Sequence, residues 1–73
     1  MPKLRVFSAR ALCALLQEHG FAQTRQSGSH IVMRKQMPPG ARTVIVPNHN
    51  EIRRGTLKSI IEQSGLPRAL FMN

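Results

Sequence analysis

The spacing of apolar residues changes twice along this chain, and that change most limits the folds that the chain can adopt. In residues 8–20 the apolar side chains, among them Leu12 and Leu16, recur every three to four positions, which is the period of an amphipathic helix. Ser8 stands where an N-cap residue belongs, and Gly20 stands where a left-handed residue closes a helix. The spacing therefore predicts a helix over 8–20.

The middle of the chain has the alternation and the branched side chains that are typical of β-strands. Ser27-Gly28 has the composition of a two-residue hairpin turn, and two prolines followed by a glycine mark residues 36–42 as a loop. These signals predict an antiparallel meander of three strands, over residues 21–26, 29–35 and 43–46.

A second helical segment follows a polar loop. Thr56 is a suitable N-cap and Gly65 a suitable stop, so we expect a helix over 56–64 and a short turn over 67–71. The chain is thus predicted to be α+β, with the order helix, strand, strand, strand, helix. Both helices are expected to cover one face of the three-stranded antiparallel sheet and to leave the other face in water.

Residues 1–73 are expected to form one domain with a strongly basic surface. Eleven Lys and Arg residues face three Glu residues, giving a formal net charge of +8. The cations are spread along the whole chain, which indicates a basic folded surface rather than a basic tail. Such a surface suits RNA, an anionic membrane or an acidic protein, and we favour RNA.

The remaining composition points to the cytoplasm. Cys13 falls in the first predicted helix and has no second cysteine to pair with, which fits a buried residue in a reducing compartment. No segment approaches the apolar length of a membrane span, and residues 1–7 lack the apolar core of a signal peptide. We expect a soluble, intracellular protein.

His30 is the leading catalytic candidate. Gly28 lets the chain turn sharply, so His30 stands beside a tight turn at the beginning of a strand. If Ile31 and Met33 face the helices, alternation points His30 and Arg34 toward solvent. An imidazole accepts and returns a proton near neutral pH, as cleavage of RNA by its own 2′-hydroxyl requires. The competing interpretation is an incidental surface histidine.

Other chemistries lack the residues that they need. Two-metal nucleases gather several carboxylates, whereas Glu18, Glu51 and Glu62 are scattered along the chain. The histidines and Cys13 do not have zinc-ligand spacing, and no glycine-rich loop follows a strand. We therefore expect metal-free chemistry without a cofactor.

Several further residues are candidates for supporting roles. His49 either takes part in the site or has a capping or packing role at the exit of the third strand. His19 is expected at a helix C-terminus, where it suits the helix dipole. Basic side chains would hold the RNA backbone and stabilise its developing charge. The RNA-binding candidates are Arg25, Arg34, Lys35, Arg53, Arg54 and Lys58.

Five motifs follow one another in a specific order. They are Gly20-Phe21, Arg25-Gln26-Ser27-Gly28-Ser29-His30, Val46-Pro47-Asn48-His49, Gly55-Thr56-Leu57-Lys58-Ser59-Ile60-Ile61 and Gly65-Leu66. In this order and spacing, over roughly residues 9–66, they resemble the HicA toxin family.

The resemblance implies a fold like the double-stranded RNA-binding domain and a ribosome-independent mRNA interferase whose essential histidine is His30. Gly28 carries over as the turn residue that positions the histidine, with Ser29 and His49 as candidates for supporting positions. The resemblance also implies a prokaryotic, cytoplasmic protein and a HicB-type antitoxin that covers His30. The free toxin is expected to be monomeric.

Two alternatives stay open. A non-catalytic domain that binds structured RNA would need the basic surface but not His30. A dock for an acidic protein, without RNA activity, would also use the basic surface, and this function overlaps with the toxin because a toxin must bind its antitoxin.

Overall fold

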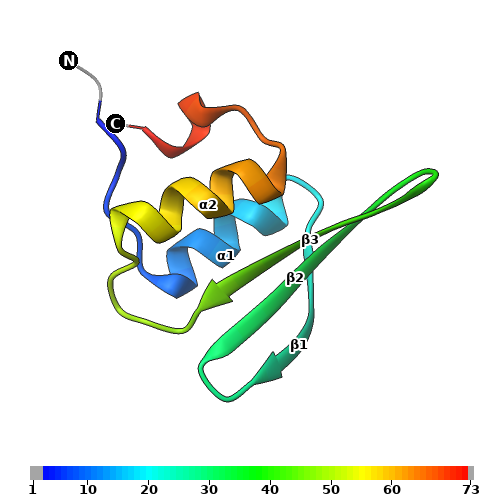
Figure 1. Ribbon diagram of the computed structural model, residues 1–73, viewed down its shortest axis with the longest axis horizontal. Coiled ribbons are helices and arrows are strands. Elements are labelled where there is room, and N and C mark those ends of the chain that lie inside the picture. The colour runs from blue at the N-terminus through cyan, green and yellow to red at the C-terminus, as the bar shows by residue number, and fades with distance from the viewer. Residues whose placement is uncertain (1–2, 73) are drawn as a thin grey trace.

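The computed structural model describes residues 3–72 and shows an α+β fold (Figure 1). The three strands lie in the order β1-β2-β3 in one antiparallel sheet, with a helix before and a helix after it in the chain. The predicted fold class is confirmed. The elements are α1 (Ala9–Glu18), β1 (Ala22–Ser27), β2 (His30–Met37), β3 (Gly40–Pro47), α2 (Arg54–Ser64) and the short 3-10 helix η1 (Arg68–Phe71).

Helix α1 begins and ends where its sequence signals stand. The Ser8 hydroxyl accepts a hydrogen bond from the Ala11 N–H at 3.1 Å, which satisfies one of the unpaired donors of the first turn. Gly20, with a φ of +96°, follows the last turn in the left-handed region that favours glycine. Leu12 and Leu16 are fully buried on the inner face.

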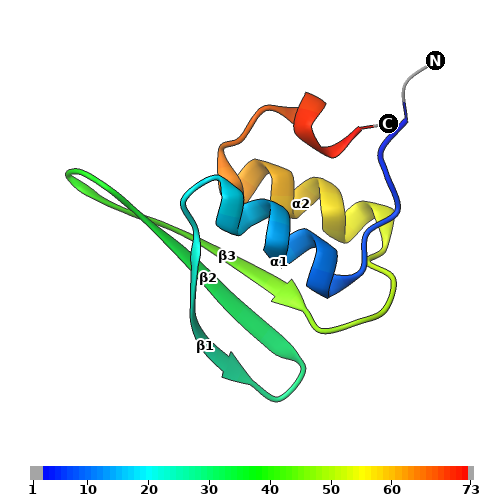
Figure 2. The ribbon, with the colours of Figure 1, turned by 180° about the vertical axis from the view of Figure 1, so that it is seen from behind.

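The sheet buries one face and exposes the other. Where the sheet faces the helices, four alternate residues of β2 and β3 are buried: Ile31, Met33, Val44 and Val46. On the outer face, Ile45 is 48% exposed. Helix α2 packs against β3 (Figure 2). The Ile45 N–H donates to the Gln63 Oε1 at 3.4 Å. The helices therefore cover one face, as the alternation predicts.

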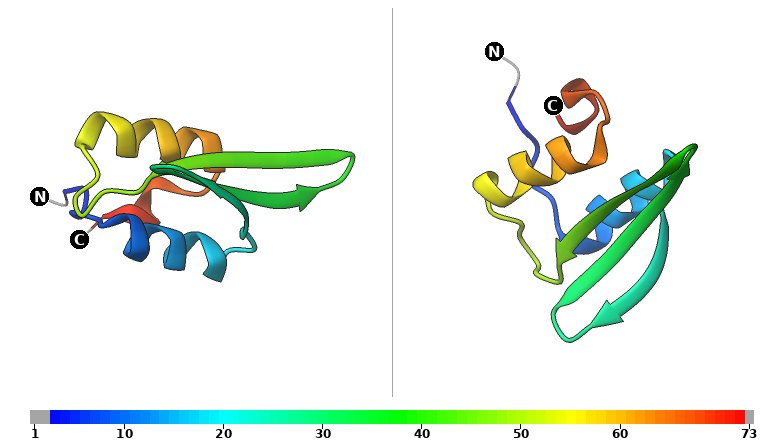
Figure 3. Two further views of the ribbon diagram at one scale, coloured as in Figure 1. Left: turned by 90° about the horizontal axis from the view of Figure 1, so that it is seen from below. Right: turned by 45° about the vertical axis from the view of Figure 1, so that its right-hand side comes forward.

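The predicted loop over 36–42 is wrong. Strands β2 and β3 continue through it as a hairpin, with Met37 paired to Gly40 and only Pro38 and Pro39 in the turn. Both prolines stand outside the ladder, so their missing N–H groups cost no strand hydrogen bond. The hairpin extends beyond the helices, where both faces are in water (left view of Figure 3).

Two other predicted boundaries also shift. The turn before β2 consists of Gly28 and Ser29 rather than Ser27-Gly28. Helix α2 begins at Arg54 with Arg53 as its N-cap, so Thr56 is a residue of the first turn and not the cap. The Ile52 N–H donates to the Phe7 carbonyl at 2.8 Å, which fixes the chain just before the helix and lets it start early.

The two ends of the described chain run side by side over α2. Leu4 forms an antiparallel bridge with Met72, and the Arg5 N–H donates to the Phe71 carbonyl at 2.8 Å. The rings of Phe7 and Phe71 meet edge to face, with centroids 6.0 Å apart, and both are buried. This contact places the first and last described segments next to the same helix (Figure 1).

Candidate active site

His30 is the first residue of β2 and lies directly after the Gly28–Ser29 turn. Gly28 has a φ of +57° at the first central position of this two-residue turn, where a hairpin of this kind favours glycine. The His30 side chain is exposed, while its neighbour Ile31 is buried. The predicted orientation of His30 toward solvent is therefore confirmed.

A hydrogen bond joins the turn before β2 to the chain that leaves β3. The Asn48 N–H donates to the Ser29 carbonyl at 2.6 Å, and His30 is paired with Pro47 across the sheet. The next residue, His49, is held by its own backbone: its N–H donates to the Pro47 carbonyl at 2.9 Å, and its carbonyl accepts from the Ala9 N–H at 2.9 Å. The backbone thus brings His49 near His30 without using either imidazole.

Both histidines line one open pocket of about 460 Å³. The sheet contributes its outer face, the loop after β3 contributes His49, and the start of α2 contributes a guanidinium and a hydroxyl. The lining residues are His30, Ile45, Pro47, His49, Arg53 and Thr56. Four segments of the chain meet there, and the pocket is large enough to hold part of a nucleotide.

This set of side chains suits chemistry on a phosphodiester. Imidazole is the side chain that most readily takes up and gives back a proton near neutral pH, and two of them allow one to remove a proton while the other supplies one. The guanidinium of Arg53 is permanently charged and matches the geometry of phosphate oxygens. Ile45 and Pro47 offer an apolar surface on which a ribose or base can rest.

Comparison with known families finds a match. The family model for the HicA toxin of bacterial toxin–antitoxin systems matches residues 9–66, which include both histidines and the start of α2. The chain belongs to the HicA toxin family. A comparison with curated proteins finds no match.

The structure brings part of the predicted basic set of this HicA family member to the histidines. Arg53 lines the pocket itself. Arg25 and Arg34 share the outer sheet face with His30, because Arg25 is paired with Val32 and directly opposed residues of antiparallel strands point to the same side. Arg53 is thus in the pocket, and Arg25 and Arg34 are on the sheet face that the pocket shares.

The other three predicted cations lie elsewhere. Lys35 is on the inner side of β2, where its ammonium group is 5.9 Å from the centroid of the Phe21 ring. Arg54 and Lys58 line a different pocket. Alternation along β2 predicts opposite faces for Arg34 and Lys35, but no sequence pattern shows that Arg53 and Arg54 line different pockets.

Three members of the site were missed from the sequence. Thr56 was assigned to helix capping, Ile45 was assigned to a strand, and Pro47 was noted only as part of a motif. Arg53 and Thr56 are three residues apart at the start of α2, but this spacing is a signal only once the helix is known to begin at Arg54. The placement of His19 at the end of α1, as its C-cap, agrees with the prediction.

Two further findings concern the part of the chain that the structure describes. Residues 3–72 contain no group of three or more His, Cys, Asp or Glu side chains that could hold a metal ion. Within the same range, no helix has the length and apolarity to cross a membrane.

Proposed function

We propose that this HicA family toxin is a metal-independent, ribosome-independent endoribonuclease that cleaves mRNA, with His30 as its catalytic histidine. The observation that carries the proposal is that His30 and His49 line one open pocket together with Arg53. The formal net charge of +8 supports a polyanionic substrate. We propose the cytoplasm as the site of action, since that is where bacterial mRNA is found.

In the proposed reaction, His30 takes the proton of the 2′-hydroxyl, and the 2′-oxygen forms a bond to the adjacent phosphorus. The bond between phosphorus and the 5′-oxygen breaks, and His49 in its protonated form gives its proton to the leaving oxygen. The products are a 2′,3′-cyclic phosphate and a 5′-hydroxyl. The attacking group is already tethered beside the phosphorus, so positioning and proton transfer account for most of the work.

Arg53 completes the proposed site. Negative charge grows on the non-bridging oxygens as the 2′-oxygen adds to phosphorus, and a guanidinium in the same pocket stabilises that charge. Gly28 and Ser29 form the turn that positions His30, and the Ser29 carbonyl connects this turn to the segment that carries His49. On the outer sheet face, Arg25 and Arg34 are proposed to hold the flanking backbone.

The direct test is cleavage of a defined RNA by the purified toxin and by its His30→Ala variant, both in EDTA. We expect the variant to lose about 10²–10⁴-fold in rate, the usual contribution of one acid–base group, with an unchanged melting temperature. His19→Ala is the matched control, because His19 lies at the end of α1 and not in the pocket. Equal cleavage by wild type and His30→Ala would overturn the proposal.

The same experiment distinguishes the nuclease from the second candidate function, a domain that binds structured RNA without cleaving it. Such a domain would bind the RNA in a gel-shift assay without producing a cyclic phosphate end, whether or not His30 is present. The arrangement of two histidines and an arginine in one pocket favours the nuclease, because phosphate and 2′-hydroxyl contacts alone would not need imidazoles.

We also propose that a HicB-type antitoxin inhibits the toxin by covering the His30 pocket, and that the toxin without it is a monomer. The pocket is open and includes the exposed Arg53, and exposed Arg25 and Arg34 stand on the same sheet face, which suits an inhibitor with an acidic surface. Co-expression with the protein encoded beside the toxin gene should restore growth and block RNA cleavage. Cleavage that continues in the purified complex would contradict this mode of inhibition.

A further inference from the structure

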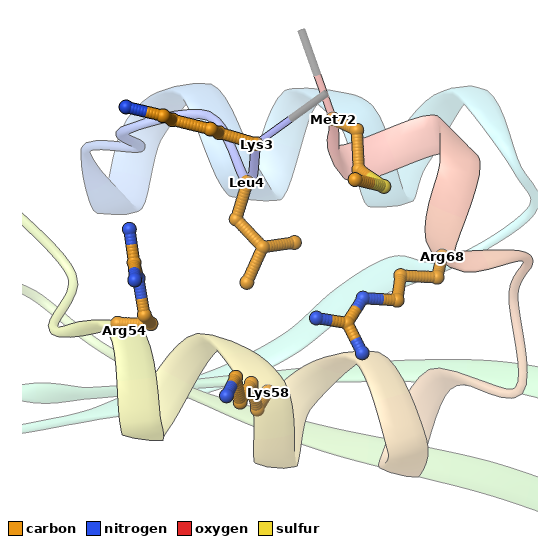
Figure 4. A pocket seen from close by; sticks show the side chains of 6 residues that line it. All are labelled: Lys3, Leu4, Arg54, Lys58, Arg68 and Met72. Atoms are coloured by element: carbon orange, nitrogen blue, oxygen red, sulfur yellow. The ribbon is translucent and has the colours of Figure 1, made fainter. Parts of the chain in front are cut away.

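A second pocket, of about 300 Å³, lies over the outer side of α2, away from the sheet. Four of its six lining residues are cations, and none is acidic: Lys3, Leu4, Arg54, Lys58, Arg68 and Met72. Figure 4 shows Arg54 and Lys58 on α2, with Arg68 and Leu4 pointing into the space above the helix. We call this group the basic pocket.

Three segments that are far apart in the sequence build the basic pocket. Arg54 and Lys58 are one turn apart on α2 and so share a helix face. Arg68 belongs to η1, and Lys3 precedes the Leu4–Met72 bridge that holds the two ends of the described chain together. The fold thus brings together Lys3, two cations of α2 and Arg68 of the C-terminal segment.

Acidic residues stand only at the margins of this pocket. Glu62, one turn after Lys58, shares an adjoining hollow with Lys58 and Arg68, and Glu51 shares another hollow with Arg54. Like charges held close together repel one another, and an anion that carries several oxygens would relieve this repulsion. Guanidinium groups in particular match phosphate oxygens in pairs of parallel hydrogen bonds.

The first turn of α2 connects the basic pocket with the His30 pocket. Arg53 and Thr56 line the His30 pocket, while Arg54 and Lys58 line the basic pocket. Neighbouring residues at one end of the helix therefore line two different pockets. An RNA backbone that leaves the His30 pocket over Arg53 meets Arg54 next. RNA carries a negative charge at every nucleotide, so a strand that follows this route places phosphates along it.

We infer that the basic pocket binds a backbone phosphate of the RNA strand whose cleaved phosphodiester lies at His30. This inference rests on the proposed nuclease function. It names a second subsite, formed by Arg54, Lys58 and Arg68, that does no chemistry and anchors the substrate. It follows that a long RNA, which spans both pockets, is a better substrate than a short one that fills only the His30 pocket.

The test compares Lys58→Gln/Arg68→Gln with Arg10→Gln/Arg42→Gln, which removes the same charge at two positions outside both pockets. We expect the first variant to raise KM for a long RNA about tenfold and to leave KM for a trinucleotide containing the same cleavage site unchanged. The control variant should change neither KM by more than the general effect of reduced charge. Charge-retaining Lys58→Arg/Arg68→Lys should restore tight binding of the long RNA.

Binding in the His30→Ala background makes the two proposals separable, because it needs no cleavage. There the logarithm of the association constant for the long RNA decreases as the logarithm of the salt concentration rises. This dependence should become shallower by about 0.7 for each phosphate that Lys58→Gln/Arg68→Gln can no longer neutralise. This weaker salt dependence would support the phosphate subsite even if the wild-type toxin proved not to cleave RNA. A folded variant with an unchanged salt dependence and an unchanged KM would overturn the subsite. A variant that loses only antitoxin binding would also overturn it, because the pocket would then bind an acidic protein segment.

Discussion

At the scale of single residues, His49 contributes to the fold through its backbone and not through its imidazole. The His49 backbone carbonyl accepts from the Ala9 N–H at the start of α1, so the fold uses this residue's main chain and leaves its imidazole available. His49→Ala should therefore lower RNA cleavage by about 10²–10⁴-fold while the melting temperature stays within error of wild type. Added imidazole should restore part of the activity.

Rescue by imidazole separates proton transfer from a structural role, because a small base in solution replaces a missing side chain but not a missing packing contact. His19→Ala serves again as the control, with full activity and no response to imidazole. A His49→Ala variant that cleaves at the wild-type rate would leave the leaving-group proton without its proposed donor.

Gly28 permits a second residue-scale prediction. Its φ is +57°, and an added Cβ would have no heavy atom of a non-neighbouring residue within 4 Å, so the backbone conformation rather than space restricts this position. Ser29 does not have a positive φ, so Gly28 occupies the first position of a type II′ turn, where glycine is favoured over residues with a Cβ. Gly40→Ala, at a glycine with equal space around its Cβ position but no positive φ, is the control and should keep both stability and cleavage. Gly28→Val should lose about 1–2 kcal/mol of unfolding free energy, measured in urea, and should lower cleavage by displacing His30.

Cys13 should be an inert thiol. It is 9% exposed on the inner side of α1, and burial raises the pKa of its thiol. Because the thiolate is the reactive form, iodoacetamide at pH 8 should label the native protein far more slowly than the same protein in concentrated urea. Labelling in the native protein should increase as the pH rises above the ordinary range of a cysteine. Equal rates for native and unfolded protein would show that Cys13 is accessible.

At the scale of secondary structure elements, the beginning of α2 combines two roles that conflict. Arg53 has the extended backbone of an N-cap residue, with φ −63° and ψ 148°, but its side chain makes no capping hydrogen bond. Arg53→Ser should supply that bond and raise the free energy of unfolding by about 1 kcal/mol. The same change removes the guanidinium from the His30 pocket and should reduce kcat.

A more stable, less active Arg53→Ser toxin would support the assignment of Arg53 to the site. Arg10→Ser, in α1 and outside the His30 pocket, is the control for the loss of one positive charge. Thermal melting and single-turnover cleavage give the two readouts. An Arg53→Ser variant with full kcat would show that this guanidinium takes no part in the reaction.

The sequence identifies correctly those elements that have local signals and bury only one of their faces. Ser8 and Gly20 bracket α1 with a cap and a left-handed residue, and the buried Ile31 and Met33 alternate with less buried residues on β2. Residues 36–41 are all exposed, so the outer half of the hairpin has no burial pattern from which a strand could be inferred. Helix α2 begins early because a tertiary contact, the Ile52 N–H to the Phe7 carbonyl, fixes the preceding chain.

At the scale of the whole molecule, the position of His30 was predictable and the pocket around it was not. His30 depends on a turn and an alternation among neighbouring residues, which the sequence displays directly. The pocket depends on the pairing of His30 with Pro47 and on where α2 begins, so His49 and Thr56 reach it only through the fold. Lys3 and Arg68 are even farther apart in the sequence, and the fold alone brings them into the basic pocket.

The charge of the whole molecule leads to a last prediction, about how the toxin meets its antitoxin. Eleven cations and three acids give a field that attracts an acidic inhibitor from a distance, and most of these cations are exposed. Salt screens that attraction over about 8 Å at physiological ionic strength, so the association rate should fall steeply as salt is added, while the dissociation rate changes little. Stopped-flow mixing over a series of salt concentrations measures both rates. An association rate that does not change with salt would mean that contact at the His30 pocket, rather than the basic surface, governs the encounter.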